Sequence, residues 1–476
     1  MAGALSRIGL VVHGQPPELV GGTERLVDEL ARALAGRGLS VEVFTGSIEW
    51  RPRFEVVRDE SGPVPRVRVH RHDLFFERWD KVANPFVESA FLRWLDAFSP
   101  QVLHVHHWAR LSTRLVVPAR TRGIPVVLSL HDLFSSCPRY HRVKADLSFC
   151  EVPPSPEACR HCAPRWRFQG DAEIDASVEA FASQLRAEVA AADVLVAPTA
   201  GHGERLLRWL SLQRTVVALP PASEAVLGPA SRPLGDRAAS AEDPLRAGVF
   251  GHLHPLKGVE VLLDAQAALA DPRALEVHVW GEAPEPAMDA ALKARAGARR
   301  VVWHGRYAPA DLGGAPIDVA VLPTLCAESY SFALDEAATL GVPVLATDLG
   351  ALADRRTERM ELFPRGDARA LAALLQGLMA DPARRASRVR APAPARITMG
   401  RHLAELLAIY ERLAAEPARA PAFTAPQAEA EQAWLERSGH AFELREAGLR
   451  ELLRSEGWED VVARLQAEND ALRRAR

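Results

Sequence analysis

Short apolar runs alternate with amphipathic segments along most of the chain. Ile8–Val12 and Val41–Phe44 have the length and composition of buried parallel strands. Between them, apolar residues recur at spacings of three and four, which is typical of a helix with one buried face. These residues are Leu26, Leu30, Ala33 and Leu34. The order strand, helix, strand predicts a βαβ unit at the start of the chain.

This alternation continues in two series, separated by residues 222–244, which are rich in Ala, Pro, Ser and Gly and indicate a linker. The first series adds predicted strands at Val102–Val105, Val126–Leu130, Val194–Ala197 and Val216–Leu219. The second has predicted strands at Ala247–Phe250, Val277–Trp280, Val301–His304, Val319–Leu322 and Val344–Ala346, and predicted helices at Val259–Leu269, Phe332–Leu340 and Ala368–Met379. The pattern predicts an α/β protein with two doubly wound Rossmann-type domains, 1–221 and 245–416, facing a ligand-binding cleft.

The composition changes after residue 416. Residues 417–427 are rich in Pro and Ala and indicate a second linker, and residues 428–476 are predicted to form a helical tail. Apolar and Asn positions near the end follow heptad spacing: Trp458, Val462, Leu465, Asn469 and Leu472. Two interpretations stay open for residues 428–476, an amphipathic helix that is docked or solvated, and self-association as a short coiled coil.

Charge and hydropathy limit the partners and the location. The 476 residues carry a formal net charge of -3, so no nucleic-acid partner is expected. No transmembrane helix or signal peptide is recognised, so the expected location is the cytoplasm. An aromatic and basic stretch fits either a core with a solvated face or a peripheral contact at the inner membrane face, reaching a lipid-linked acceptor. It comprises Trp79, Phe86, Phe91 and Trp94 with Arg78, Lys81 and Arg93.

The segment 319–347 combines a strand, a loop and a helix with two acidic residues. Glu328 lies in the loop and Ser331 is a predicted N-cap, so the following N–H groups form an anion site at the start of the helix. These groups belong to Phe332, Ala333 and Leu334. Glu336, one turn further, can accept two hydroxyl hydrogen bonds, as from a ribose. The segment therefore predicts a site for a phosphate and a sugar.

Other predicted strand ends carry residues suited to the same ligand. Lys257, in the loop Gly251–Gly258, can reach a diphosphate as a point charge. Gly21 and Gly22 precede a helix and permit close backbone approach. His131, at the end of a strand, can hydrogen-bond a sugar hydroxyl or support charge in a transition state.

Taken together, these segments resemble the retaining glycosyltransferases of family 4, which have the GT-B fold. Glu328 and Glu336 have the spacing of the E-x7-E motif of that family. Similar stretches are GVFGHLHPLKGVEVLLDA at 248–265, LGVPVLATDLGAL at 340–352 and GGTE at 21–24. The similarity covers about residues 7 to 410.

The resemblance implies a retaining transfer of sugar from a nucleoside-diphosphate sugar to a glycan, lipid-linked or other hydroxyl acceptor, in bacterial polysaccharide biosynthesis. It implies no metal or cofactor for catalysis. The implied catalytic residues are His131, Glu328 and Lys257. The implied donor-binding residues are Gly21, Gly22, His252, Lys257, Glu328, Ser331, Phe332, Ala333, Leu334 and Glu336.

His252 departs from the resembled family, which usually has Arg at this position, and a neutral imidazole offers less charge to a diphosphate. Two alternatives stay open beside the transferase. One is a sugar-nucleotide epimerase of related fold. The other is a non-catalytic sugar-nucleotide-binding scaffold subunit that assembles through residues 428–476.

Four of the five cysteines lie in a Pro- and Arg-rich insertion at about 133–170. They are Cys137, Cys150, Cys159 and Cys162. Four thiolates can bind one zinc ion tetrahedrally, and a metal would explain the order of a segment that lacks core-forming residues. The spacing is not that of a regular zinc finger, so a structural zinc site and four free thiols are equal alternatives.

Overall fold

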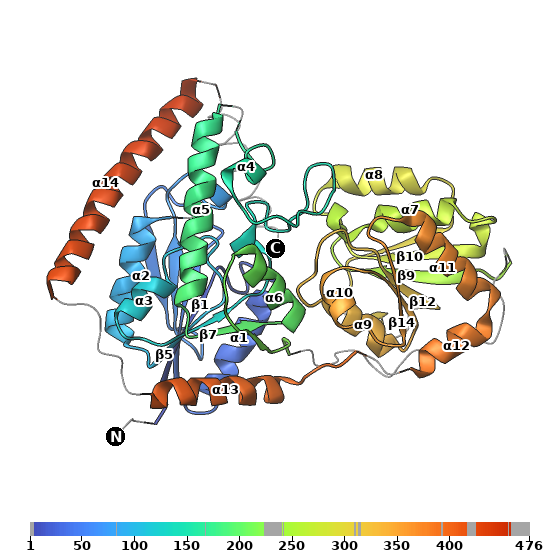
Figure 1. The fold of residues 1–476 in the computed structure, drawn as a ribbon, viewed down its shortest axis with the longest axis horizontal. Helices are drawn as coiled ribbons and strands as arrows, with labels where there is room; N and C mark the ends of the chain where they lie inside the picture. Colours follow the sequence, from blue (N-terminus) through green and yellow to red (C-terminus); the bar gives the residue numbers. More distant parts are fainter. Residues whose placement is uncertain are drawn as a thin grey trace. The chain divides into compact units, whose positions relative to one another are not determined.

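Two β-sheets form the framework of the chain (Figure 1). The computed structural model describes residues 4–81, 83–166, 168–222, 240, 242–308, 311–312, 316–391, 394–416, 425–455 and 457. The first sheet has eight strands in the order β3-β4-β2-β1-β5-β6-β7-β8, and the second has six in the order β11-β10-β9-β12-β13-β14. β3 and β4 are antiparallel, whereas β1 pairs in parallel with both β2 and β5.

The first sheet and its helices extend to residue 218. Its strands are β1 (Arg7–Val12), β2 (Ser40–Gly46), β3 (Glu55–Asp59), β4 (Arg66–His70), β5 (Val102–Val105), β6 (Val126–Ser129), β7 (Val194–Ala197) and β8 (Val217–Ala218). The helices between them are α1 (Gly22–Ala35), α2 (Pro85–Phe98), α3 (Val116–Thr121), α4 (Pro156–Cys159), α5 (Asp171–Ala191) and α6 (Ala200–Trp209). The strands predicted from continuous apolar runs are confirmed. β3 was not predicted because it is a largely exposed edge strand with a charged sequence.

The second sheet follows the same rule of alternation. Its strands are β9 (Leu245–Phe250), β10 (Leu275–Trp280), β11 (Val301–Gly305), β12 (Val319–Leu322), β13 (Val344–Thr347) and β14 (Met360–Phe363). Its helices are α7 (Val259–Ala267), α8 (Pro286–Ala296), α9 (Phe332–Leu340), α10 (Gly350–Asp354), α11 (Ala368–Ala380) and α12 (Pro382–Arg390), and α13 (Met399–Ala415) and α14 (Ala425–Ser455) follow. The predicted bounds of β12 and α9 are confirmed to the residue.

The reason for the continuous apolar runs is visible in β12. Val319 and Val321 pack in one buried cluster of the second sheet, whereas Ala320 and Leu322 pack in the other. Successive side chains point to opposite faces of a strand, so a sheet covered by helices on both faces needs apolar residues at every position. This arrangement leaves the strand ends, rather than the strand faces, for polar chemistry.

The chain folds into two compact units. One comprises residues 1–128, 187–193 and 410–476, and the other comprises 129–186 and 194–409. The loops after β9 and β12 lie in the second unit, together with His131 and the cysteine-rich segment. The loop after β1 and helix α14 lie in the first unit.

Helix α14 packs against α2 in the first unit. Its buried residues include Leu435, Phe442 and Leu453, and Phe442 lies 5.8 Å from Phe86 between ring centroids. Residues 433–455 thus fit the docked-helix interpretation of the tail. The heptad positions at 458–472 lie outside the described residues, so the coiled-coil interpretation stays a prediction there.

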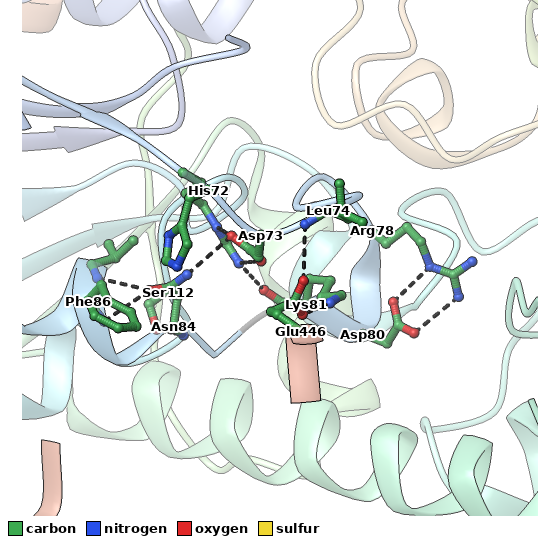
Figure 2. A network of polar contacts seen from close by, with 12 residues as sticks. His72, Asp73, Leu74, Arg78, Asp80, Lys81, Asn84, Phe86, Ser112 and Glu446 are labelled. Carbon is green, nitrogen blue, oxygen red and sulfur yellow. Dashed lines mark hydrogen bonds and ion pairs between the residues drawn. The ribbon is translucent and has the colours of Figure 1, made fainter. Parts of the chain in front are cut away.

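A buried polar network fastens α14 to the loop before α2 (Figure 2). Glu446 forms an ion pair with Lys81 and accepts the Leu74 N–H at 3.1 Å. Next to them Arg71 and Asp73 form a fully buried pair, with 2.5 Å between Nη2 and Oδ2, and Asn84 donates to Asp73 at 3.3 Å. Charges and hydrogen bonds therefore fix the position of α14, in addition to its apolar face.

The same network bears on the aromatic and basic stretch. Trp79, Phe91 and Trp94 are buried, and Lys81 is paired with Glu446. These side chains form core, so they are not available to a membrane surface. Among the described residues, no helix combines the length and the apolar character needed to cross a membrane.

Candidate active site

Two loops at the carboxyl ends of β9 and β12 are joined through their backbones. The Leu325 N–H donates to the Leu256 carbonyl at 2.7 Å, and the Thr324 hydroxyl donates to the same carbonyl at 3.0 Å. Gly258 has a φ of 68°, and a Cβ at this position would lie 1.9 Å from the Pro323 carbonyl oxygen. Only glycine allows this approach, which positions the 3-10 helix η3 (Pro255–Lys257) beside the loop after β12.

This junction brings Lys257 and Glu328 together. Lys257 Nζ lies 2.6 Å from Glu328 Oε1, and the lysine side chain keeps 37% exposure while that of Glu328 is 16% exposed. Burial opposes the charge of Lys257, but the Glu328 carboxylate outweighs it and raises the pKa of the lysine. Two residues predicted for donor binding, 71 positions apart in the sequence, thus form one charged pair.

The backbone of Glu328 is held by the start of α10. The Ala351 N–H donates to the Glu328 carbonyl at 2.8 Å. Gly350 has a φ of 60°, and a Cβ there would lie 2.7 Å from that same carbonyl oxygen. At the other end of α10, Asp354 accepts hydrogen bonds from Arg205 and Thr199. The loop of Glu328 is therefore hydrogen-bonded to α10, and α10 is hydrogen-bonded in turn to α6 and its N-cap residue.

The start of α9 differs in part from the prediction. Ser331 occupies the predicted N-cap position with a φ of 69°, and its side chain makes no capping hydrogen bond. The Leu334 N–H donates to the Ser331 carbonyl at 3.2 Å and is therefore not free for an anion. The helix start keeps the N–H groups of Phe332 and Ala333 as its anion-binding donors.

Glu336 projects from α9 toward a residue that the sequence did not indicate. The Tyr307 hydroxyl, two residues after β11, donates to Glu336 Oε2 at 2.9 Å. Burial raises the pKa of Glu336 to about 7, while the Tyr307 hydrogen bond and, more weakly, Lys257 act in the opposite direction. Tyr307 follows a predicted strand, and this position was the signal that could have marked it.

His252 and His131 occupy strand ends as predicted, without a described contact to the Lys257–Glu328 pair. His252 follows β9 and its side chain is exposed. His131 follows β6 and is partly buried. The neighbouring Asp132 accepts the Phe134 N–H at 2.9 Å, which is a turn-forming role. The roles of both histidines stay predictions.

Gly21 and Gly22 begin α1 in the first unit. A Cβ on Gly21 would lie 2.5 Å from Glu24 Oε2, so glycine allows this carboxylate to fold back over the helix start. Glu24 in turn accepts from His13 Nε2 at 2.8 Å, and the His13 ring lies 4.2 Å from that of His107. Burial lowers the pKa of His13 to about 4, so the ring is neutral at pH 7. This grouping of His13, Glu24 and His107 was not predicted, because the fold brings together the ends of β1 and β5 and the first turn of α1.

The chain matches two family models and several named relatives. Residues 20–222 match the family model described as Glycosyltransferase Family 4, and residues 244–381 match that of Glycosyl transferases group 1. The D-inositol 3-phosphate glycosyltransferase of Actinosynnema mirum is 30% identical over 382 residues, covering 72% of this chain and 81% of that protein. The protein of the same name from Jonesia denitrificans is 28% identical over 427 residues, covering 82% and 91%.

Solved structures share the fold. Sucrose-phosphate synthase from Thermosynechococcus elongatus has a TM-score of 0.59 at 20% identity and covers 87% of this chain and 100% of its own. Anabaena HepE in complex with UDP and glucose has a TM-score of 0.54 at 15% identity, covering 84% and 98%. With two matched family models in order and relatives that span nearly the whole fold, the chain belongs to glycosyltransferase family 4, the glycosyl transferases group 1, and is a glycosyltransferase of the GT-B fold.

Proposed function

We propose that the protein transfers a sugar, with retention of configuration, from a nucleoside-diphosphate sugar to a hydroxyl acceptor. The observation that carries this proposal is the Lys257–Glu328 pair beside the start of α9. A cation, two N–H groups at a helix start and two carboxylates, one from a loop and one from α9, match the charges and hydroxyls of such a donor. The solved structures named with UDP and glucose have the same fold, which supports this donor class.

Each residue has a distinct task in this proposal. Lys257 and the N–H groups of Phe332 and Ala333 stabilise the charge that develops on the leaving diphosphate. Glu336, oriented by Tyr307, accepts the ribose hydroxyls, and Glu328 accepts hydroxyls of the donor sugar. Glu328 neutralises Lys257 in the free protein, so donor binding must exchange this ion pair for one between Lys257 and phosphate.

The acceptor proposal rests on the relatives. Those reported above are named D-inositol 3-phosphate glycosyltransferases, so inositol 3-phosphate is the first acceptor to test. Glycan and lipid-linked acceptors should be tested next. Transfer of sugar to a glycan would support a role in polysaccharide biosynthesis.

Donor turnover tests the proposal. Incubation with a panel of nucleoside-diphosphate sugars should release nucleoside diphosphate from one of them, and Glu336→Ala should lower the release at least about tenfold, because a ribose hydrogen bond to a charged group is lost. The matched control is Glu285→Ala, an exposed glutamate of the same domain, which should keep the wild-type rate. Interconversion of donor sugars without release would support an epimerase instead, and binding without turnover would support a scaffold.

The raised pKa of Glu336 predicts a pH dependence of nucleoside binding. A carboxyl group with a pKa of about 7 is mostly protonated at pH 6 and mostly ionised at pH 8. Since the ionised form is the stronger acceptor, affinity for the nucleoside of the preferred donor should rise about fivefold over this range. Titration calorimetry of wild type and Glu336→Gln checks this prediction. Equal pH dependence in the two proteins would contradict the assignment of Glu336 to the ribose.

A further inference from the structure

The four clustered cysteines line a single cavity in the second unit. Cys137 follows the short 3-10 helix η2 (Phe134–Ser136), Cys159 ends α4, and Cys162 lies one turn further on. Together with Cys150 they line a small cavity of about 20 Å³. Residues as far apart as 137 and 162 thus line one cavity.

The segment that carries them has little regular secondary structure. Between residues 137 and 163, regular structure among the described residues is limited to the four-residue helix α4 and a single bridge between Val143 and Phe149. Its buried apolar side chains are Cys137, Pro138, Val143 and Ala163, and Tyr140 and Phe149 add ring contacts with Phe134 and Trp209. For a segment of this length the core is small, and a cross-link would stabilise it further.

A buried positive charge is a second, independent indication of an anionic metal site in this cavity. Arg142 is 1% exposed, and its guanidinium donates to the backbone carbonyls of Ser136, Cys150 and Val152. Its Nη2 lies 3.7 Å from Cys150 Sγ, and the group stacks 4.0 Å from the Trp209 ring. No carboxylate of the described residues forms an ion pair with it. A buried cation without an anionic partner is costly, and the thiols are the groups beside it that can become anions.

We propose that Cys137, Cys150, Cys159 and Cys162 bind one Zn²⁺ ion as four thiolates. Four thiolates and one zinc ion carry a net charge of about -2. Three basic side chains line the cavity and offset this negative charge: Arg139, Arg142 and Lys144. Each thiol releases its proton to solvent as its zinc–sulfur bond forms. The site therefore accounts for the buried arginine and the sparse core at once.

Backbone geometry already supports two of the ligands. The Arg139 N–H donates to Cys137 Sγ at 3.4 Å, a contact that stabilises a thiolate. The Cys162 and Ala163 N–H groups both donate to the Cys159 carbonyl, which forms a tight turn between the paired cysteines. In the part of the chain that the structure describes, no three His, Cys, Asp or Glu side chains are grouped closely enough to hold an ion, so binding must draw the sulfur atoms inward.

A bound ion would also affect the donor site. Arg365 donates from Nε to the Leu325 carbonyl at 2.7 Å and from Nη2 to the Leu147 carbonyl. Leu325 belongs to the loop of Glu328, and Leu147 belongs to the cysteine-rich segment. Zinc would therefore stabilise a segment that is hydrogen-bonded, through one arginine, to the candidate active site.

Metal analysis tests the proposal directly. The full-length protein, purified without chelator and desalted, should contain close to one zinc per chain. Cys159→Ser should lose nearly all of it, whereas Cys326→Ser, at a cysteine outside the cavity, should keep it. Zinc content well below one in the wild type, or iron in its place, would overturn the proposal.

Thiol alkylation provides a second measurement that does not depend on a variant folding. In native wild-type protein the four cavity cysteines should resist an alkylating reagent and become reactive when a strong chelator is added. Cys326 should react equally in both conditions. If mass spectrometry instead finds the four cysteines in disulfides, or alkylated at the same rate with and without chelator, the zinc site is wrong.

Discussion

Replacing Lys257 with alanine should weaken binding of the donor's nucleoside diphosphate by about 2–3 kcal/mol, or about 30- to 150-fold. Lys257 is a cation of the loop after β9, and its Nζ lies 2.6 Å from a Glu328 carboxylate oxygen that it must release when phosphate arrives. The same charge stabilises the leaving diphosphate, so kcat should fall by about 10² to 10³ as well. Calorimetry and initial rates measure the two effects separately.

Two further variants make this prediction specific. Lys293→Ala removes an exposed lysine of the same domain that pairs with Asp289, and it should leave binding and rate unchanged. Glu328→Gln removes the carboxylate that competes for Lys257, so it should tighten diphosphate binding by up to about tenfold while transfer falls. Unaltered affinity in Lys257→Ala would contradict the assignment of this loop to the donor phosphates.

Local sequence patterns were sufficient to predict the strands, helices and loops that carry the candidate active site. β12 and α9 could be predicted to the residue, because a fully buried strand and a helix ending at Gly341 each leave a continuous signal in the sequence. The spacing of Glu328 and Glu336 is a property of one loop and one helix, and it carried the family resemblance. Lys257 was also predicted, because its loop follows a strand and opens a helix.

Contacts between distant segments could not be predicted in this way. Tyr307 reaches Glu336 across 29 residues, and His13 meets His107 only because β1 and β5 are neighbours in the sheet. The backbone at Ser331 also departs from its pattern: a serine before a helix predicts a side-chain cap, whereas a positive φ turns this residue away from that geometry. Each case depends on tertiary contacts, which the spacing of apolar residues along the sequence does not predict.

The docking of α14 on α2 is another contact between distant segments that sequence patterns did not predict. The Lys81–Glu446 pair at this contact gives the second prediction. Glu446→Ala should lower the free energy of unfolding by about 3–5 kcal/mol, because it leaves Lys81 charged and unpaired at a site where that side chain is only 10% exposed. The Leu74 N–H loses its acceptor as well. Since α14 is packed on α2, the loss should appear as faster hydrogen exchange across 433–455. The control, Glu451→Ala, removes an exposed pair with Arg454 and should change exchange little.

Replacing both Lys81 and Glu446 separates two contributions to stability. One is the penalty for a single unpaired buried charge, and the other is the net contribution of the intact ion pair. Burial lowers the pKa of Lys81 even with Glu446 beside it, so desolvation outweighs the attraction between the two charges. Lys81→Met combined with Glu446→Leu should therefore restore most of the exchange protection of α14, although neither charge remains and the Leu74 N–H still lacks its acceptor. If the double variant exchanges as fast as Glu446→Ala, the ion pair itself, rather than the burial of an unpaired charge, holds the helix on α2.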